Sequence, residues 1–305
     1  MCPGQGSQTP GFLTPWLDLP GVRERAGEIG EACGIDLIAH GTVSDEETIK
    51  DTAVAQPLIV AAGLLTAPAV LGPNAADLVA GHSVGEITAT ALAGVFDDGS
   101  AVRFVAQRAR GMAEASAATP TGMTAVLGGT PDDVAATLER HGLTAANMNG
   151  GGQVVAAGTM EQLAALAADP PAKARVIPLK VAGAFHTEHM APAVPALAEL
   201  AKTLTAQAPS TTLLSNRDGA AIADGREAVD RLVAQVTRPV RWDQCMEAML
   251  TLGVTAMIEL APAGTLVGLA KRGMKGVETL AVKTPDDLDA ASTLIAAHAG
   301  SKEQS

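Results

Sequence analysis

The sequence predicts an α/β protein in two parts: a large subdomain with a mainly parallel sheet and a small ferredoxin-like subdomain inserted into it. Two observations carry this prediction. Helix and strand patterns alternate before residue 116 and again after residue 184, as in parallel sheets covered by helices on both faces. Between these segments the order of elements is βαββαβ. The 305 residues are 47% hydrophobic, enough for a large core.

The first part of the large subdomain is predicted to hold one buried strand and three helices. The strand, residues 78 to 80, stops at a glycine, and helix-compatible sequence begins at residue 84 and continues to 93. Another helix is predicted over residues 100 to 115. The most apolar run, residues 57 to 71, predicts a buried helix with Pro57 in its first turn, and we interpret this run as too short to span a bilayer.

The insert is predicted over residues 117 to 183, which divides the large subdomain into residues 1 to 116 and 184 to 305. Its predicted strands are residues 123 to 127, 145 to 148, 153 to 157 and 175 to 181, and its helices are 131 to 141, with Thr130 as N-cap, and 159 to 168.

Beyond the insert, helices alternate with strands again. The helices are predicted at about 190 to 204, 226 to 235, 242 to 252 and 265 to 274, and the strands at 212 to 214 and 254 to 259. A cleft between the two subdomains is the expected place for a ligand.

Composition excludes several classes of function. A net charge of -12 and an aromatic content of 2% disfavour nucleic-acid binding, which needs clustered cations and stacking platforms. Three isolated cysteines form no C-x-x-C pair, so neither a disulfide framework nor a thiolate zinc site is predicted, and a reducing cytoplasm is the expected compartment. The first residues lack the features of a signal peptide, and no association with a membrane is expected.

The pentapeptide GHSVG, residues 81 to 85, matches the G-x-S-x-G pattern of a nucleophile elbow. In this elbow two glycines make room for a sharp turn from strand to helix, which exposes the serine hydroxyl. A lone match of this length fits a small-residue turn equally well. Ser83 is therefore a candidate nucleophile that still needs a base.

Histidine is the usual base for a serine nucleophile. We expect the ring of His82 to point away from Ser83, because neighbouring residues lie on different sides of a tight turn. Three other histidines lie in polar segments that suggest the surface: His40, His141 and His298. His186 directly follows the last strand of the insert, at the seam between the subdomains, where a base facing the elbow is expected.

The same segment also invites a metal interpretation, since His186, Glu188 and His189 lie close together in the sequence. No H-E-x-x-H pattern or third placed ligand accompanies them, so no metal site is predicted. His189, at a helix start, is expected to contact nearby polar groups.

Several motifs in register over nearly the whole chain resemble the malonyl-CoA:acyl carrier protein transacylase family. Each motif is weak alone, but their joint order is specific. They are PGQGSQ (3 to 8), GHSVGE (81 to 86), QRARGM around Arg108, GAFH (183 to 186), VTRPVRW (236 to 242) and ELAPAGTLVGLAKR (259 to 272). The Phe185-His186 pair resembles the variant that goes with malonyl rather than methylmalonyl units.

The resemblance implies a hydrolase-like large subdomain and a role for each matching residue. Ser83 is implied as nucleophile and His186 as general base and later general acid. The backbone N–H groups of Gln5 and Val84 are implied to form the oxyanion hole. Arg108 is implied to pair with the malonyl carboxylate, although without the family match it would be interpreted as a solvated helix charge, as Arg103 and Arg110 are.

Two further residues complete the implied site. The backbone carbonyl of Gln235 is implied to orient the histidine, and Asn149, before a glycine turn, is expected to line the cleft. The implied reaction is ping-pong transfer of malonyl from malonyl-CoA to the phosphopantetheine thiol of acyl carrier protein, with no metal or organic cofactor. We expect a monomer.

An acidic carrier protein would need a local cationic patch on this acidic chain. Two sets of residues qualify, and the sequence leaves the choice open. They are Lys173, Arg175 and Lys180 on the insert, and Arg238, Arg241, Lys271, Arg272 and Lys275 on the large subdomain.

Two other classes of function fit parts of the sequence. The elbow alone permits a serine hydrolase, but no orienting Asp or Glu follows in the order that such enzymes require. A non-catalytic binding subunit is disfavoured because Ser83, His186 and Arg108 are all present.

One feature departs from the family pattern. Members usually have a short apolar strand before the PGQG segment, whereas only Met1 and Cys2 precede it here. We expect either that the given start lies downstream of the true one or that the central sheet lacks a strand, which would weaken the anchoring of Gln5.

Overall fold

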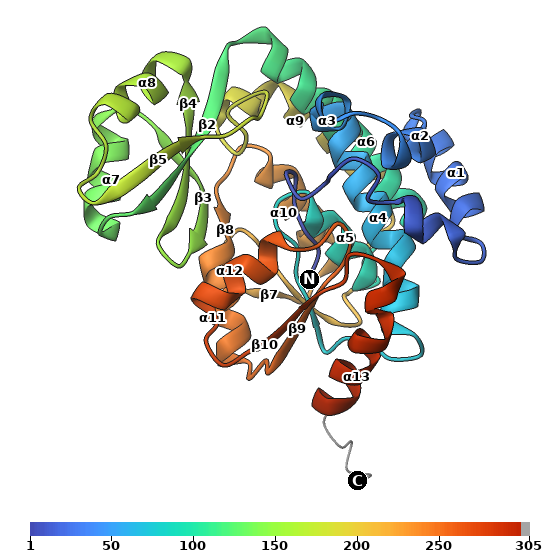
Figure 1. The fold of residues 1–305 in the computed structure, drawn as a ribbon. Helices are drawn as coiled ribbons and strands as arrows, with labels where there is room; N and C mark the ends of the chain where they lie inside the picture. The colour runs from blue at the N-terminus through green and yellow to red at the C-terminus, as the bar shows by residue number, and fades with distance from the viewer. Residues whose placement is uncertain (300–305) are drawn as a thin grey trace.

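The computed structural model describes residues 1 to 299 and confirms a mixed α/β architecture of two subdomains. Figure 1 shows the small one at the upper left, with its two helices on the side of its sheet that faces away from the rest of the molecule. The large one holds the remaining helices, and the N-terminus lies near its centre.

The small subdomain has the strand order that its βαββαβ sequence predicts. Its four strands pair in the order β5-β2-β4-β3, and all three pairings are antiparallel, as in ferredoxin-like folds. Two helices cover this sheet. The bounds are β2 (Thr121–Gly128), α7 (Pro131–Arg140), β3 (Thr144–Gly150), β4 (Gln153–Thr159), α8 (Met160–Ala168) and β5 (Ala174–Pro178).

A fifth strand, which the sequence did not indicate, joins this sheet from the large subdomain. The strand β8 (Val240–Arg241) runs parallel to β3, with Asn147 opposite Val240. Two residues are too short a pattern to predict a strand, because the pairing depends on a distant partner. The two subdomains are therefore joined by backbone hydrogen bonds as well as by the chain.

The sheet of the large subdomain consists of short parallel pairs. The strand β1 (Leu78–Val79) pairs in parallel with β6 (Thr212–Leu214), which also pairs in antiparallel fashion with β7 (Ala221–Ile222). Separately, β9 (Ala256–Glu259) pairs in parallel with β10 (Glu278–Ala281). The sequence indicated β6 and β9 but not β7 or β10.

Met1 and Cys2 lie between these two groups of strands. Met1 exchanges two backbone hydrogen bonds with the β9 side, to Ile258 O at 2.7 Å and from Leu260 N at 2.9 Å. Cys2 does the same with the β1 side, to Ala80 O at 2.9 Å and from His82 N at 3.0 Å. The expected loss of a strand is thus only partial, since two residues connect the groups and anchor the segment that leads to Gln5.

The N-terminal helices pack around the central helix α4 (Thr52–Leu71), which corrects two sequence expectations. Its 20 residues begin five residues before Pro57, because the Asp51 side chain caps the helix by accepting a hydrogen bond from Ala53 N. The helix is long and apolar enough to cross a membrane, but 78% of its most apolar window is buried inside the protein. It is therefore placed as a core helix.

The helix after the elbow, α5 (Gly85–Leu92), and the long helix α6 (Asp98–Ala118) pack against α4 in the main hydrophobic core. The preceding segment contributes elements for which the sequence analysis made no prediction. These are the 3-10 helix η1 (Thr14–Asp18) and the helices α1 (Val22–Cys33), α2 (Leu37–Thr42) and α3 (Glu46–Lys50).

The C-terminal third follows the predicted alternation with one correction. The helix expected from 190 to 204 divides into a 3-10 helix, η2 (Glu188–Ala193), and α9 (Val194–Thr203), because prolines at 192 and 195 cannot donate backbone hydrogen bonds. The other elements are α10 (Gly225–Gln235), α11 (Trp242–Thr251), α12 (Thr265–Gly273), η3 (Pro285–Asp287) and the unpredicted α13 (Leu288–His298).

Candidate active site

The elbow between β1 and α5 has the strained backbone that its motif requires. Ser83 adopts a φ of 52°, in the left-handed region that non-glycine residues seldom occupy. A Cβ atom at Gly81 would lie 2.0 Å from Gly85 O, and one at Gly85 would lie 2.2 Å from Cys2 O. Both positions therefore require glycine, which explains the spacing of the motif.

Ser83 and His186 are in hydrogen-bond contact across the seam between the subdomains. Ser83 Oγ lies 2.7 Å from His186 Nε2, and His186 Nδ1 lies 2.8 Å from the backbone O of Gln235. A carbonyl oxygen only accepts, so Nδ1 carries the proton and Nε2 is free to accept the serine proton. Like Ser83, His186 has a positive φ, of 61°.

The environment of His186 keeps its ring neutral. The residue is 2% exposed, and this burial, together with the nearby positive charge of Arg108, lowers the imidazole pKa to about 3. The neutral ring is the form that can act as a base. The third member of the constellation is a backbone carbonyl, not the carboxylate of a hydrolase triad.

A cavity of about 280 Å³ opens beside this pair. Ser83, His186, Gln5 and Asn149 all line it. Most of its other lining residues come from the small subdomain, from α4, α6 and α12 and from the segment before His186, and include Met112, Met123, Val155, Phe185, Leu266 and Arg272.

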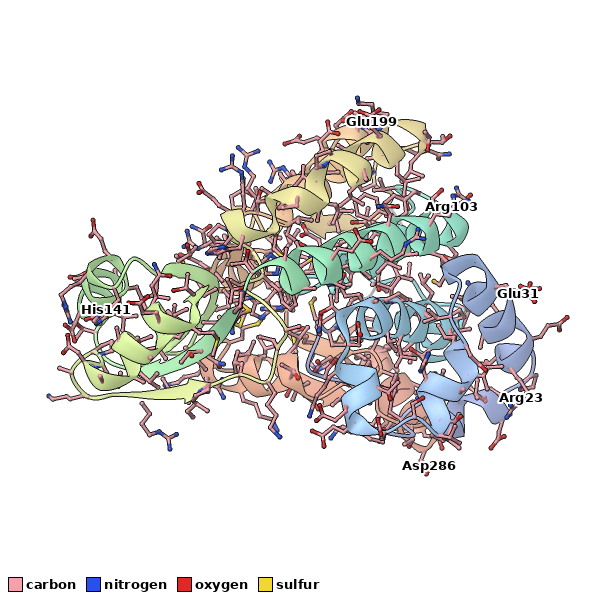
Figure 2. All side chains as sticks on the ribbon, turned by 90° about the horizontal axis from the view of Figure 1, so that it is seen from above. Arg23, Glu31, Arg103, His141, Glu199 and Asp286 are labelled. Atoms are coloured by element: carbon pink, nitrogen blue, oxygen red, sulfur yellow. The ribbon has the colours of Figure 1, made fainter. Side chains whose placement is uncertain are left out.

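Arg108 lies behind this cavity and does not line it. The side chain is 1% exposed, whereas Arg103 and Arg110 on the same helix are exposed, and Figure 2 shows Arg103 on the outside of α6. Its Nη1 donates to Gln56 Oε1 at 2.6 Å, and its Nη2 donates to Gln235 Oε1 at 2.9 Å. The interpretation as a solvated helix charge is therefore wrong for Arg108.

The guanidinium of Arg108 is incompletely neutralised. Burial lowers its pKa to about 10, and the charge of Glu86 opposes this shift. Its Nε has no hydrogen-bond partner, and among residues 1 to 299 no carboxylate forms an ion pair with Arg108. An uncompensated buried cation with an orphan donor is suited to receive an anionic ligand group.

The backbone amides of Gln5 and Val84, which the family resemblance implies as an oxyanion hole, are available as donors. Val84 is the N-cap of α5, where backbone N–H groups point out of the helix. Within the described part of the chain, neither the backbone N–H of Gln5 nor that of Val84 donates a hydrogen bond to another protein group. The Gln5 side chain contacts Lys50 O and Thr52 Oγ1, each at 3.4 Å.

The ring of His82 contacts Asn149 and Trp242 and forms no hydrogen bond with Ser83, in agreement with the expectation. His82 lines the same cavity as Ser83, and its Nε2 lies 2.8 Å from Asn149 Oδ1. Its ring also packs edge-on against Trp242, with 5.7 Å between the ring centroids. Burial lowers the pKa of His82. The other three histidines assigned to the surface are partly exposed, with His141 near Asp169.

Three residues of the site were not predicted from the sequence. Gln56 directly precedes the apolar run of residues 57 to 71 and was given no role, although a polar side chain beside such a run is itself a signal. Asn216 carries no local signal, because its contacts with the elbow are more than 130 positions away in the sequence. Glu86 lies within the GHSVGE motif but received no role.

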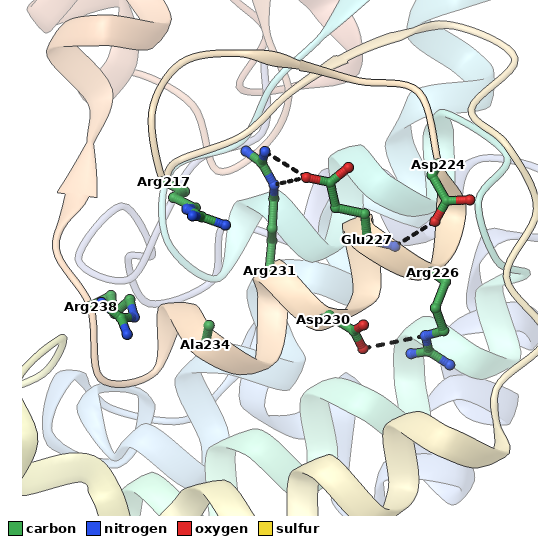
Figure 3. Close-up of a pocket in the computed structure, with 8 residues that line it drawn as sticks. All are labelled: Arg217, Asp224, Arg226, Glu227, Asp230, Arg231, Ala234 and Arg238. Atoms are coloured by element: carbon green, nitrogen blue, oxygen red, sulfur yellow. Dashed lines mark hydrogen bonds and ion pairs between the residues drawn. The ribbon is translucent and has the colours of Figure 1, made fainter.

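A larger groove of about 500 Å³ runs along α10, but it contains no nucleophile. Figure 3 shows that most of its charges are paired with one another, with Glu227 facing Arg231 and Asp230 facing Arg226. No group of three His, Cys, Asp or Glu side chains in residues 1 to 299 could hold a metal ion. The cavity at Ser83 is therefore the candidate active site.

Comparison with known proteins agrees with this geometry. A family model described as the acyl transferase domain matches residues 1 to 296. The chain belongs to the acyl transferase domain family. This family member is an acyltransferase, and its similarity to malonyl CoA-acyl carrier protein transacylases confirms the resemblance inferred from the motifs.

Individual relatives cover almost all of the chain. It is 51% identical to the malonyl CoA-acyl carrier protein transacylase of Mycobacterium tuberculosis strain H37Rv, over 96% of this chain and 99% of that protein. The crystal structure of MCAT from Mycobacterium tuberculosis matches with a TM-score of 0.91 over 95% of this chain and 98% of that one. A type II PKS acyl-carrier protein in complex with its malonyl-transacylase matches with a TM-score of 0.87 and 30% identity, over 95% and 96%.

Proposed function

We propose that this acyltransferase moves a malonyl group from malonyl-CoA to the phosphopantetheine thiol of an acyl carrier protein, through a malonyl ester of Ser83. The observation that carries the proposal is the 2.7 Å contact between Ser83 Oγ and His186 Nε2 at a cavity backed by the buried Arg108. The names of the relatives support the acyl group, and the complex with an acyl-carrier protein supports the partner.

In the first half-reaction, Ser83 Oγ attacks the thioester carbon while His186 Nε2 takes the hydroxyl proton. The Gln5 and Val84 amides stabilise the negative oxygen of the tetrahedral intermediate, each by about 3 kcal/mol. The carbon–sulfur bond then breaks, and His186 returns its proton to the departing CoA thiolate. The products are malonyl-serine and free CoA, so atoms and charge balance.

The second half-reaction runs the same chemistry in reverse order. His186 takes the proton of the phosphopantetheine thiol, the sulfur attacks the ester carbon, and the Ser83 oxygen leaves with the proton that His186 holds. The backbone carbonyl of Gln235 keeps the imidazole oriented through both steps. Because a thioester is already activated, no metal or organic cofactor is needed.

Selection of the malonyl group falls to Arg108. Gln56 lines the cavity and contacts the guanidinium, so the acyl carboxylate approaches Arg108 on this side and displaces or shares the Gln56 contact. An acyl group without a carboxylate leaves the buried cation unpaired, which disfavours its transfer.

We further propose that the protein works as a monomer in the cytoplasm. One chain supplies the nucleophile, the base and the cation, so a second copy is not required for chemistry. Cys2, Cys33 and Cys245 are free thiols, which suits a reducing compartment. Light scattering and cell fractionation test these two points; a dimer or a secreted protein would contradict them.

Radiolabelled malonyl-CoA tests the reaction itself. We expect covalent label on the wild-type protein that transfers to the thiol of an added carrier protein, and no label on Ser83→Ala. Release of free malonate without transfer would instead indicate a hydrolase, and absence of label on the folded wild-type protein would indicate a binding protein. Either result would overturn the proposal.

A further inference from the structure

One buried carboxylate beneath the site takes no part in the proposed steps. Glu86 lies in the first turn of α5, three residues after Ser83, and is 2% exposed. A helix N-terminus favours a negative charge there. Burial nevertheless raises the pKa of this carboxyl to about 7. Keeping the side chain ionised inside the protein therefore costs free energy.

Both carboxylate oxygens of Glu86 accept hydrogen bonds from residues that hold catalytic groups. Oε1 accepts from the backbone N of Asn216 at 2.9 Å, and Oε2 accepts from Gln235 Nε2. Asn216 in turn clamps the elbow, since its Oδ1 accepts from Ser83 N and its Nδ2 donates to Gly81 O, both at 2.7 Å.

Gln235 extends the network to the other two functional residues. Its backbone O accepts from His186 Nδ1, and its side-chain Oε1 accepts from Arg108 Nη2. Its Nε2 faces three acceptors, which are Glu86 Oε2, Ser83 O at 3.1 Å and Asn216 Oδ1 at 3.2 Å. These acceptors fix the orientation of the amide, so that its oxygen must face Arg108.

We propose that Glu86 is a positioning residue that sets Ser83, His186 and Arg108 relative to one another through Asn216 and Gln235. The assignment rests on the proposed function of Ser83, His186 and Arg108. A carboxylate accepts at both oxygens, whereas an amide accepts at one only. Glu86→Gln therefore either leaves Asn216 N without its acceptor or turns a side-chain NH2 group toward Gln235 Nε2, although the two side chains have nearly the same shape.

The test compares malonyl-CoA with acetyl-CoA as acyl donors, because loss of folded protein lowers both rates equally. We expect Glu86→Gln to lower the rate of malonyl transfer per folded molecule at least 10-fold and to lower the malonyl-to-acetyl ratio of kcat/KM at least 5-fold. The ratio falls because Gln235 no longer holds Arg108 in place.

Leu138→Ala is the matched control, since it opens a cavity in the separate core of the small subdomain. It is expected to lower stability and leave the ratio unchanged. Asn216→Ala provides a second variant in case Glu86→Gln does not fold. It removes the contacts with Ser83 N and Gly81 O, whereas Gln235 Nε2 keeps Glu86 Oε2 and Ser83 O as acceptors. The rate should therefore fall at least 10-fold while the ratio stays within 2-fold.

The outcomes separate the two proposals. If Glu86→Gln keeps the wild-type rate and ratio, or loses rate with an unchanged ratio, the positioning role is overturned. If only Asn216→Ala can be measured, the positioning role is overturned by an undiminished rate of malonyl transfer or by a shifted malonyl-to-acetyl ratio. If the wild-type protein forms no malonyl-Ser83, it is the proposed function that fails.

Discussion

At Arg108 the surroundings of the side chain decide its chemistry. Arg103, Arg108 and Arg110 share one helix, yet only Arg108 is enclosed, with two amide oxygens as partners and one orphan donor. Amide oxygens solvate the guanidinium without cancelling its charge. The free protein therefore holds a buried cation without an ion-pair partner, as the proposed binding of an acyl carboxylate requires.

Replacing this cation tests its role in selection. Arg108→Ala is expected to lower kcat/KM for malonyl-CoA by about 30- to 4000-fold, as loss of a buried charge contact of about 2–5 kcal/mol would. Acetyl-CoA should be affected much less, and steady-state kinetics with both donors measure the difference. An equal loss of kcat/KM for the two donors would show that Arg108 does not select for the carboxylate.

The depressed pKa of His186 gives a second prediction at this scale. Because the pKa falls from 6.5 to about 3, the folded ring stays neutral at pH 5, where an unfolded chain would be protonated. The resulting stability is fully present above pH 6.5 and is lost as the pH falls toward 3. NMR titration of the His186 ring should show no protonation near pH 6.5; a midpoint there would contradict the burial argument.

At the scale of elements, the elbow depends on close contact between backbones. The β1–α5 turn approaches the N-terminal segment so tightly that Gly85 has no room for a side chain against Cys2 O. This contact links the serine to the segment that carries Gln5. Ser83 and the backbone N–H of Gln5, the proposed nucleophile and oxyanion donor, are thus placed by the same packing.

Gly85→Ala should accordingly destabilise the protein by about 3 kcal/mol or more, since the new Cβ meets rigid backbone. Gly27→Ala is the matched control, because Gly27 lies within α1 with no atom in the way of a Cβ. That variant should gain about 0.5–1 kcal/mol from helix propensity. Urea denaturation measures both; a Gly85→Ala protein as stable as wild type would refute the packing argument.

At the scale of the whole molecule, the site lies where two separately cored units meet. The small subdomain has its own apolar core, and β8 from the large subdomain completes its sheet. The seam contributes His186, while the large subdomain contributes Ser83 and Arg108. If a carrier protein delivers its thiol to Ser83, a cation that borders this cavity is the first candidate for its docking.

Arg272 meets this condition better than the alternatives. It lines the cavity and contacts Gln153, and no carboxylate in residues 1 to 299 pairs with it, whereas Arg241 is paired with Asp243. Arg272→Glu is expected to raise KM for the carrier protein roughly 10-fold at low salt and less at high salt. Lys173→Glu on the insert should change it little; the opposite ranking would move docking to the small subdomain.

Local sequence determined most of the elements of this protein. The βαββαβ order, the elbow glycines and the strand at β6 follow from short-range patterns of apolar residues and turn formers, which act within a few positions. It also singled out Ser83 and His186 as a nucleophile and its base. The family resemblance supplied Arg108 and Gln235, whose roles no local pattern indicates.

Tertiary structure alone decided what these residues touch. Ser83 and His186 are 103 positions apart in the sequence, and Asn216 is 133 positions from Ser83. Local patterns of apolar and turn-forming residues do not predict contacts over such separations. The burial of Arg108, the turn of His82 toward Asn149 and the use of Glu86 as a shared acceptor depend on which surfaces meet. A side chain's charge and hydrogen bonds are set by its neighbours in space, and only the packed fold selects those neighbours.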